Sequence, residues 1–336
     1  MKIWVLTWAV FVAGMQADTG PTPYLFPSLP FFPPMPVRAG HPVTVEGVSL
    51  GKQLFFDPIL SRDSSISCAS CHRPEKAFSD APNPFSKGVD GRLSTRNTPS
   101  LQNLAWYGNF FLDGRVTGLE EATLHPIRDP REMDFSVSAV VERLAQLPVY
   151  RGLFFQAFRN SQPDSALLAR ALGQYLRTFI AYRSVYDSAL KGEAFLSDAA
   201  LRGLEAMNDQ KRGNCISCHS LGSDALGVVP GFRNNGLDSW ERIKDAGRGA
   251  VTGKVADQGR FKTPSLRNVA ITGPYMHDGR FASLEEVLHF YSEGIHPAAD
   301  PPLTSGSRSG PRLTLQDQKD IIAFLEALTD GPVLGE

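Results

Sequence analysis

The feature that most constrains this chain is a pair of C-x-x-C-H motifs. One motif reads CASCH at 68–72, and the other reads CISCH at 215–219. Two thiols at this spacing can add to two vinyl groups of one porphyrin, and the adjacent histidine then lies beneath the iron as its proximal ligand. The sequence therefore predicts two covalently attached c-type haems, held by Cys68, Cys71, His72, Cys215, Cys218 and His219.

The cysteine count supports this interpretation. The chain has four cysteines, and all four belong to the two motifs. A disulfide framework is thereby excluded if both haems attach. A four-cysteine zinc site or a redox dithiol is the alternative. Haem is favoured because each cysteine pair is followed directly by a histidine.

Composition places the chain among ordinary globular proteins. Of its 336 residues, 42% are hydrophobic and 21% are charged, and the formal net charge is −1. This length allows one large core or two ordinary ones. A balanced charge offers no general attraction to nucleic acid, so no nucleic-acid partner is expected.

The amino terminus has the form of a targeting segment. Lys2 precedes an apolar run at 3–14, and small residues near Ala17 offer a cleavage site. The run is too short to span a membrane. We therefore expect residues 1–17 to be a signal peptide, and the mature protein to be periplasmic without a membrane span. Seven prolines at 18–36 predict an extended Pro-rich tether over 18–41.

The rest of the chain has the periodicity of helices. We expect helices over 43–56, over 136–160 with a break at Pro148, over 164–183, over 198–207 and over 314–328. No segment indicates a ladder of strands. The predicted fold is mainly α, with few or no strands.

An internal repeat locates the candidate sites. TPSLQNLA at 98–105 matches TPSLRNVA at 263–270, an offset of 165 residues. At the same offset, the DGR at 113–115 matches 278–280, and LEE at 119–121 matches 284–286. Each haem domain is therefore expected to carry one module, which consists of a turn, a D-G-R loop and a helix.

The repeat also places Pro126 opposite Tyr291. If this position faces the iron on the side away from the proximal histidine, a phenol can ligate one iron, whereas proline leaves the other iron open. One open and one closed iron suit an enzyme better than an electron carrier. Alternatively, Tyr291 is a core aromatic beside Phe290, and the repeat alone leaves both interpretations standing.

Several longer stretches match a known family. The chain resembles the bacterial dihaem cytochrome c peroxidases, a superfamily that includes MauG, over roughly 42–330. The resemblance rests on LGKQLFFDPILS (50–61), RNTPSLQN (96–103), PIRDPREM (126–133), FKTPSLRNVAITGPYMHDGR (261–280) and LEEVLHFY (284–291), together with both haem motifs. It implies two cytochrome c-like domains packed face to face, an amino-terminal peroxidatic domain at 42–185 and a carboxy-terminal electron-transfer domain at 186–332.

The resemblance also implies roles for individual residues. The family's distal glutamate corresponds to Glu132, whose carboxylate would move a proton between the two oxygens of hydrogen peroxide. Pro126 would line the same pocket, and His125 would border it. A calcium ion between the domains would be bound by oxygen atoms of Asn97, Thr272 and Pro274.

The chain departs from the family pattern at several positions. Val89 stands where many members have a histidine that caps the first iron, so the first haem is expected to be open without prior reduction. Tyr291 stands where MauG has its axial tyrosine. Leu112 stands where family members usually have a tryptophan, and Gly213 stands where MauG has one. Trp106 is either a substitute relay or a core residue.

Three functions follow from these features. The first is reduction of hydrogen peroxide to water with electrons from a small soluble donor such as cytochrome c or a cupredoxin. The second is a MauG-like oxidation of a partner protein, and the third is non-catalytic electron transfer. Glu132 and the open first site favour an enzyme, and a homodimer is compatible with each.

Overall fold

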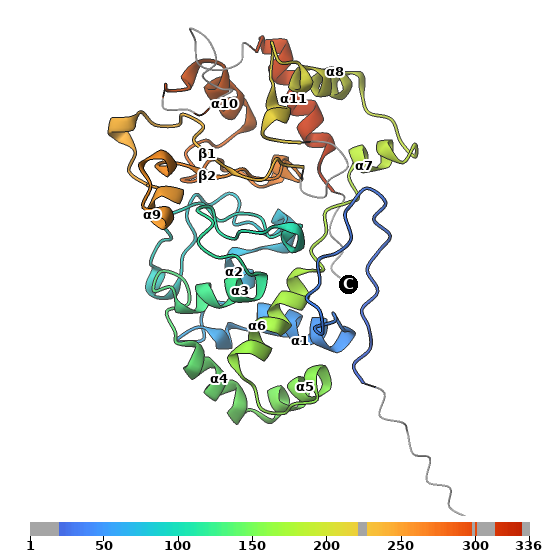
Figure 1. The fold of residues 1–336 in the computed structure, drawn as a ribbon, viewed down its shortest axis with the longest axis vertical. Coiled ribbons are helices and arrows are strands. Elements are labelled where there is room, and N and C mark those ends of the chain that lie inside the picture. Colours follow the sequence, from blue (N-terminus) through green and yellow to red (C-terminus); the bar gives the residue numbers. More distant parts are fainter. Residues whose placement is uncertain (1–19, 221–226, 298–299, 301–312, 331–336) are drawn as a thin grey trace, which may run out of the picture.

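The computed structural model describes residues 20–220, 227–297, 300 and 313–330, so the predicted signal peptide lies outside the described residues. The protein is mainly helical and has two halves stacked along its long axis (Figure 1). Strands β1 (Phe232–Arg233) and β2 (Phe261–Lys262) form a short antiparallel pair. The expected fold, mainly α with few strands, is confirmed. In the described part of the chain, no helix is both long and apolar enough to cross a membrane.

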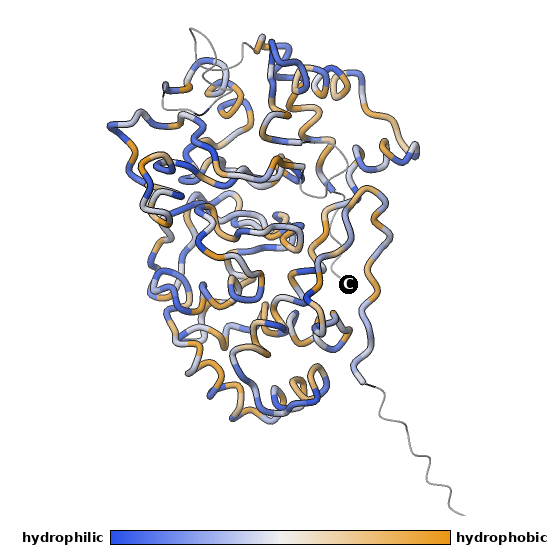
Figure 2. The backbone as a smooth tube through the Cα atoms, in the orientation of Figure 1, coloured by the Kyte–Doolittle hydropathy of each residue, from blue (hydrophilic) through white to orange (hydrophobic). Residues whose placement is uncertain are grey.

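The first half has its core around α6, which packs chiefly against α1 and α3. Close approach of α1 and α6 depends on Gly51, where an added Cβ would lie 2.1 Å from the Ala171 carbonyl oxygen. Figure 2 shows hydrophobic and hydrophilic residues alternating along the helices at the lower end of the molecule, as amphipathic helices require. The helices of this half are α1 (Val45–Phe56), α2 (Cys68–Cys71), α3 (Leu119–Arg128), α4 (Val137–Gln146), α5 (Pro148–Phe158) and α6 (Ser165–Leu176).

The second half has its core between α8 and α11, which make the most extensive helix contact in the molecule. Gly203 on α8 allows this contact, because a Cβ there would lie 2.0 Å from the Asp320 carbonyl oxygen. The elements of this half are α7 (Val185–Leu190), α8 (Asp198–Asn208), α9 (Arg248–Thr252), α10 (Leu284–His289), a π-helical turn (Phe290–Gly294) and α11 (Leu315–Ala327).

Most of the predicted helices are confirmed. The break at Pro148 separates α4 from α5, and Pro148 takes the first position of α5, where its missing N–H costs nothing. The helix predicted over 164–183 is wrong in length, because α6 ends at Leu176. Beyond it, the Asn103 side chain accepts a hydrogen bond from the Ala181 N–H at 2.9 Å. The Asn103 N–H also donates to the Phe179 carbonyl at 2.7 Å, so tertiary contacts take these residues out of the helix.

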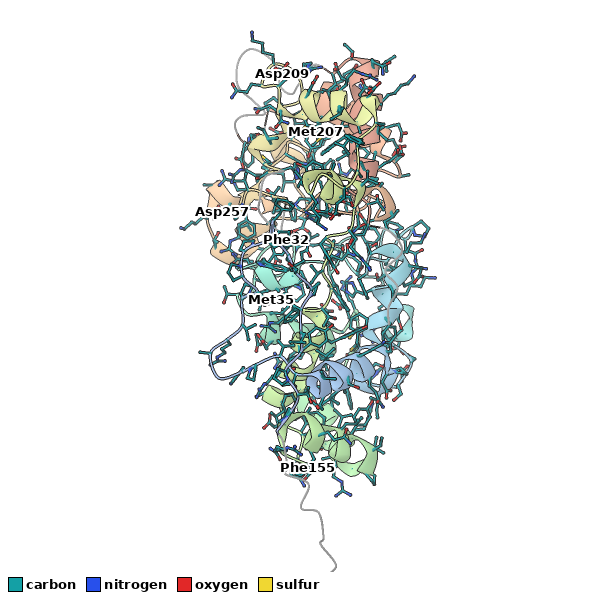
Figure 3. The ribbon with its side chains drawn as sticks, turned by 90° about the vertical axis from the view of Figure 1, so that its right-hand side faces the viewer. Phe32, Met35, Phe155, Met207, Asp209 and Asp257 are labelled. Carbon is teal, nitrogen blue, oxygen red and sulfur yellow. The ribbon has the colours of Figure 1, made fainter. Side chains whose placement is uncertain are left out.

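The Pro-rich segment at 20–41, here called the strap, lies along the surface and touches both halves (Figures 1 and 3). Trp106 of the first half donates its Nε1–H to the Pro33 carbonyl at 3.1 Å. The ring of Phe32 packs edge-on against Trp106, with 5.4 Å between centroids, and lies 5.1 Å from the Arg267 guanidinium carbon of the second half. The strap therefore bridges the junction between the halves.

The repeated module predicted from the sequence is confirmed in backbone detail. A bridge between Phe110 and Val116 in the first half matches a bridge between Tyr275 and Phe281 in the second, at the same offset of 165 residues. Within these turns, Phe111 and Met276 both have positive φ angles, +64° and +74°. Both modules therefore fold in the same way.

A polar cluster joins the two halves. Arg96 donates to both carboxylate oxygens of Asp245, at 2.6 and 2.8 Å, and to Asp113 at 2.6 Å. Because the three side chains are largely buried and fully paired, they hold the D-G-R loop of the first half in a fixed position against the second.

Candidate haem-binding and catalytic site

The first haem motif forms a single helical turn, α2, which begins at Cys68 behind a capping box made by Ser67 and Ser70. His72 follows directly, and its Nδ1–H donates to the Phe78 carbonyl at 2.8 Å. Burial lowers the pKa of His72. A neutral imidazole held through Nδ1 presents Nε2 as a free metal ligand, as a proximal histidine requires.

The thiols of this motif are unpaired and lie in a water-poor environment. Burial raises the pKa of Cys68 to about 12, and the neighbouring Cys71 and the Glu132 carboxylate add to this rise. Burial also raises the pKa of Cys71 to about 11. Glu132 therefore lies close enough to the motif for its charge to act on both thiols.

Glu132 is presented by a tight turn just beyond α3, in which its N–H donates to the Asp129 carbonyl at 3.0 Å. The Val89 N–H donates to the Glu132 carbonyl at 2.8 Å. Gly88 has no room for a side chain, since a Cβ would lie 2.4 Å from that same carbonyl oxygen. Burial raises the pKa of Glu132 to about 7; the Asp129 charge adds to this effect and Arg115 opposes it.

Pro126 and His125 occupy the last turn of α3. The Pro126 carbonyl accepts the Met133 N–H at 3.1 Å, which folds the Glu132 turn back onto the helix. The His125 ring packs edge-on against Phe111, and its Nε2 lies 3.8 Å from the Glu121 carboxylate. The contacts of the His125 ring are therefore with Phe111 and Glu121 rather than with Glu132. The charge of Arg115 reaches both His125 and Glu132.

The second haem motif begins in a 3₁₀ turn at Cys215–Ser217. The Nδ1–H of His219 donates to the Pro264 carbonyl at 3.1 Å. Burial lowers the pKa of His219 to about 4 and raises the pKa of Cys215 to about 12. His219 is therefore also a neutral ligand with a fixed Nδ1–H.

A cavity of about 350 Å³ surrounds this second motif and extends to the first half. Tyr291 and Met276 both line it, and the Asn235 side-chain amide lies 3.4 Å from the Tyr291 hydroxyl and 3.4 Å from the Met276 sulfur. Tyr291 belongs to the π-helical turn, a geometry common at functional sites. Sequence reasoning selected Tyr291 through the repeat but missed Asn235 and the position of Met276.

The residues present fit two covalent haems. Four free thiols, two imidazoles fixed through Nδ1 and a largely apolar cavity at the second motif together form the donor set of c-type haem. Met133, in contrast, is buried in the core of the first half and does not line this cavity. It is therefore a packing residue.

The three residues expected to bind calcium, Asn97, Thr272 and Pro274, line the same cavity at the junction of the halves. The Asn97 side-chain amide donates to the Pro84 carbonyl at 3.2 Å, which leaves its Oδ1 available as an acceptor. Among the described residues, no cluster of three or more His, Cys, Asp and Glu side chains could hold a metal ion. A cation here would depend on the side-chain oxygen of Asn97 and on the backbone carbonyl oxygens of Thr272 and Pro274.

Comparison with known proteins identifies relatives along most of the chain. The family model described as Di-haem cytochrome c peroxidase matches residues 45–195. The methylamine utilization protein MauG of Methylophilus methylotrophus is 36% identical over 301 residues, which cover 88% of this chain and 86% of that protein. The cytochrome c551 peroxidase of Pseudomonas aeruginosa is 31% identical and covers 89% of this chain and 84% of that protein.

Solved structures agree with the sequence comparisons. A MauG-like protein associated with microbial copper homeostasis has a TM-score of 0.82 at 34% identity, covering 91% of this chain and 96% of that chain. The diheme peroxidase BthA from Burkholderia thailandensis has a TM-score of 0.77 at 26% identity, covering 88% and 89% of the two chains. By identity and coverage, this chain belongs to the di-haem cytochrome c peroxidase and MauG family.

Proposed function

We propose that this protein reduces hydrogen peroxide to water at its first haem motif, with electrons supplied by a small soluble donor such as cytochrome c or a cupredoxin. The observation that carries the proposal is the position of Glu132, a buried carboxyl group whose pKa is raised to about 7 and whose charge acts on the Cys68 and Cys71 thiols. Active sites place acids and bases near neutral pKa so that they can both take and release a proton.

The haem attached at Cys68 and Cys71 would supply the iron at which peroxide binds and the electrons that cleave its O–O bond. Glu132 would accept the proton of the nearer oxygen and deliver it to the departing oxygen, which leaves as water. Two electrons and two further protons complete the conversion of one peroxide to two waters. A carboxylate in this role contributes about 10²- to 10⁴-fold in rate.

The first site is proposed to be open to peroxide in its oxidised form. Val89 is buried, with 1% of its surface exposed, and its N–H is bonded to the Glu132 carbonyl. Neither valine nor Pro126 has a side-chain atom that can ligate iron. The access of peroxide would therefore need no earlier reduction to displace a ligand.

A second candidate function is a MauG-like oxidation of a partner protein. It is favoured by Tyr291, which lines the cavity at the second haem motif and whose hydroxyl lies 3.4 Å from the Asn235 side-chain amide. A tyrosinate ligand would stabilise oxidised iron in the second half and store oxidising power there. Leu112 and Gly213, in place of tryptophans, weigh against an identical protein substrate.

Two further features are part of the proposal. A calcium ion bound by Asn97, Thr272 and Pro274 would hold the junction of the halves, which these residues line.

Export to the periplasm would follow from the signal-like segment at 1–17. It also suits the haem motifs, because covalent haem attachment takes place outside the cytoplasmic membrane in bacteria.

The deciding experiment is peroxide turnover by the as-isolated oxidised protein, compared with Glu132→Gln. The variant keeps the shape of the side chain but has no group that can shuttle the proton, and it is expected to lose about 10²-fold or more. Glu142→Gln is the matched control, since Glu142 is an exposed acid on α4 and is expected to leave the rate unchanged. Equal rates for Glu132→Gln and the unaltered protein would contradict the proposal.

Turnover with reduced cytochrome c then separates the two candidate functions. A peroxidase consumes the donor in proportion to peroxide. A protein oxidase consumes peroxide slowly with this donor and retains its oxidising equivalents. A resting oxidised protein without any high-spin iron would remove the claim of an open first site.

A further inference from the structure

The cavity at the second haem motif reaches the first half, and the side chains of the first half that line it are mostly polar or aliphatic. They come from 97–100, 102–104, Tyr107 and Leu112. Among these described residues, Tyr107 has the only aromatic ring and the only side chain that readily loses an electron. Leu112 cannot do so, because an aliphatic side chain has no accessible oxidised state.

Tyr107 also contacts the core of the first half. It packs against the hydrophobic cluster that includes Leu50 and Phe78, as do Cys68 and Ala69 of the first haem motif. The same residue thus touches the packing around one motif and the cavity around the other. Its neighbour Trp106 faces the strap instead, where its indole donates to the Pro33 carbonyl.

A lysine of the second half holds this segment. The Lys262 N–H donates to the Leu112 carbonyl at 2.7 Å, and its ammonium donates to the Asn109 carbonyl at 3.2 Å. The ammonium also lies 4.2 Å from the centre of the Tyr107 ring. A cation over an aromatic face is attracted to the neutral ring and destabilises the ring that has lost an electron.

We propose that Tyr107 carries electrons between the two halves of the molecule and that Lys262 sets the energy at which Tyr107 is oxidised. This inference rests on the proposed peroxide chemistry. Peroxide, acting in the first half, is the oxidant: one electron leaves Tyr107 and its phenolic proton passes to water. One electron from the second half, which the external donor later replaces, and one proton restore the phenol. The ring returns to its starting state after each electron has crossed.

Tyr107→Phe tests the relay, because phenylalanine keeps the packing of the ring but cannot be oxidised at comparable potentials. The oxidised holoprotein, labelled with ring-deuterated tyrosine, is mixed with hydrogen peroxide and frozen for electron paramagnetic resonance. Stopped-flow absorption follows electron exchange between the halves in the same mixture. We expect a transient tyrosyl signal in the unaltered protein, its loss in Tyr107→Phe, and electron exchange slowed by about tenfold or more.

Tyr24→Phe is the control. Tyr24 lies in the strap, where its ring packs edge-on against Phe26 with 5.0 Å between centroids, and it is not among the residues that line the cavity. This variant is expected to keep both the radical signal and the exchange rate. Absence of a tyrosyl signal in the unaltered protein, or equal behaviour of the two variants, would overturn the proposal.

Lys262→Met should change the tyrosyl radical yield in the opposite direction from Tyr107→Phe. Removing the cation makes Tyr107 easier to oxidise, so the radical yield is expected to rise. A fall in radical yield, with haem content and thermal unfolding unchanged, would contradict the assigned role of Lys262. If the protein does not react with peroxide at all, the proposed function fails; normal peroxide reduction that is indifferent to Tyr107→Phe removes the relay alone.

Discussion

The two halves of this protein share one module, and one difference within it lies at Pro126 and Tyr291, which are 165 residues apart. In the first half, α3 continues regularly through Pro126 to Arg128. In the second half, α10 stops at His289, and a π-helical turn carries Tyr291 into the cavity at the second haem motif. The same local fold therefore leaves one site without a ligating side chain and gives the other a phenol. Under the proposed function, this difference makes the first site open to peroxide and lets the second site bind iron through a phenol.

The halves also differ in how their modules are anchored. Gln102 and Arg267 occupy equivalent positions of the repeat, 165 residues apart. The Gln102 side-chain oxygen Oε1 accepts a hydrogen bond from the Asn268 side-chain amide, whereas Arg267 forms a two-fold ion pair with Asp187 at 2.8 and 2.9 Å. The first anchor joins the halves, and the second joins the module to α7. Four changes sharpen this comparison.

The largest effect is expected from Arg267→Gln, which gives the second half the residue of the first. Asp187 would remain buried, with 3% of its side chain exposed, and would lose the partner that lowers its pKa. Breaking a buried pair by removing one partner costs about 3–5 kcal/mol in the free energy of unfolding. Urea unfolding of the holoprotein measures the loss. Arg280→Gln removes more exposed pairs with Asp238 and Asp278 and should cost less than about 1 kcal/mol. Equal losses would contradict the distinction.

Tyr291→Phe removes the chemical difference between the sites without changing the shape of the ring. The reduction potential of the second haem is expected to rise by about 0.1 V or more, within the ~0.8 V range that axial ligands control. Spectroelectrochemical titration measures both potentials in one sample. The first potential serves as the internal reference, since Tyr291 belongs to the second half. If only the first potential moves, the assignment of Tyr291 is wrong.

The pH dependence of peroxide reduction reports on the first half alone. Burial raises the pKa of Glu132 to about 7, so the proton-accepting carboxylate disappears as the pH falls below that value. The rate is expected to drop about tenfold for each pH unit below the pKa. Steady-state turnover at constant ionic strength between about pH 5.5 and 8.5 provides the profile. In Glu132→Gln this limb should be absent, and a profile of unchanged shape would exclude Glu132 as its origin.

The smallest effect is expected at a helix terminus. The helices α6 and α11 have similar places in their halves, and their N-caps are Asp164 and Thr314. The Thr314 hydroxyl accepts the Asp317 N–H at 3.0 Å. Thr314→Ala should reduce the free energy of unfolding by about 1 kcal/mol, and Asp164→Ala should cost a similar amount. Thermal unfolding checks both, and a much larger loss at one cap would show that its helix has an additional role.

Much of this arrangement could be predicted from the sequence, because its signals are local. The break at Pro148 and the cap at Thr314 each depend on one residue and its neighbours in the chain. The repeat predicted one module in each half, and the structure adds matched turns with positive φ angles at Phe111 and Met276. These features need no knowledge of distant contacts.

The remaining features depend on contacts between distant segments. The end of α6 at Leu176 is determined by Asn103, which lies more than 70 residues away in the sequence. The π-helical turn that contains Tyr291 follows α10 directly, and the hydrophobic periodicity of the sequence does not distinguish it from a continued α-helix. The position of Lys262 over Tyr107 likewise arises only when the two halves meet.

The strap has a consequence for the order of maturation. It precedes both haem motifs in the chain, yet Phe32 needs Trp106 from one half and Arg267 from the other to form its contacts. The strap can therefore dock only after both halves have folded and come together, although it is synthesised first. Resistance of this segment to a protease should appear as the last step of assembly, and it would distinguish finished molecules from those that still lack a folded half.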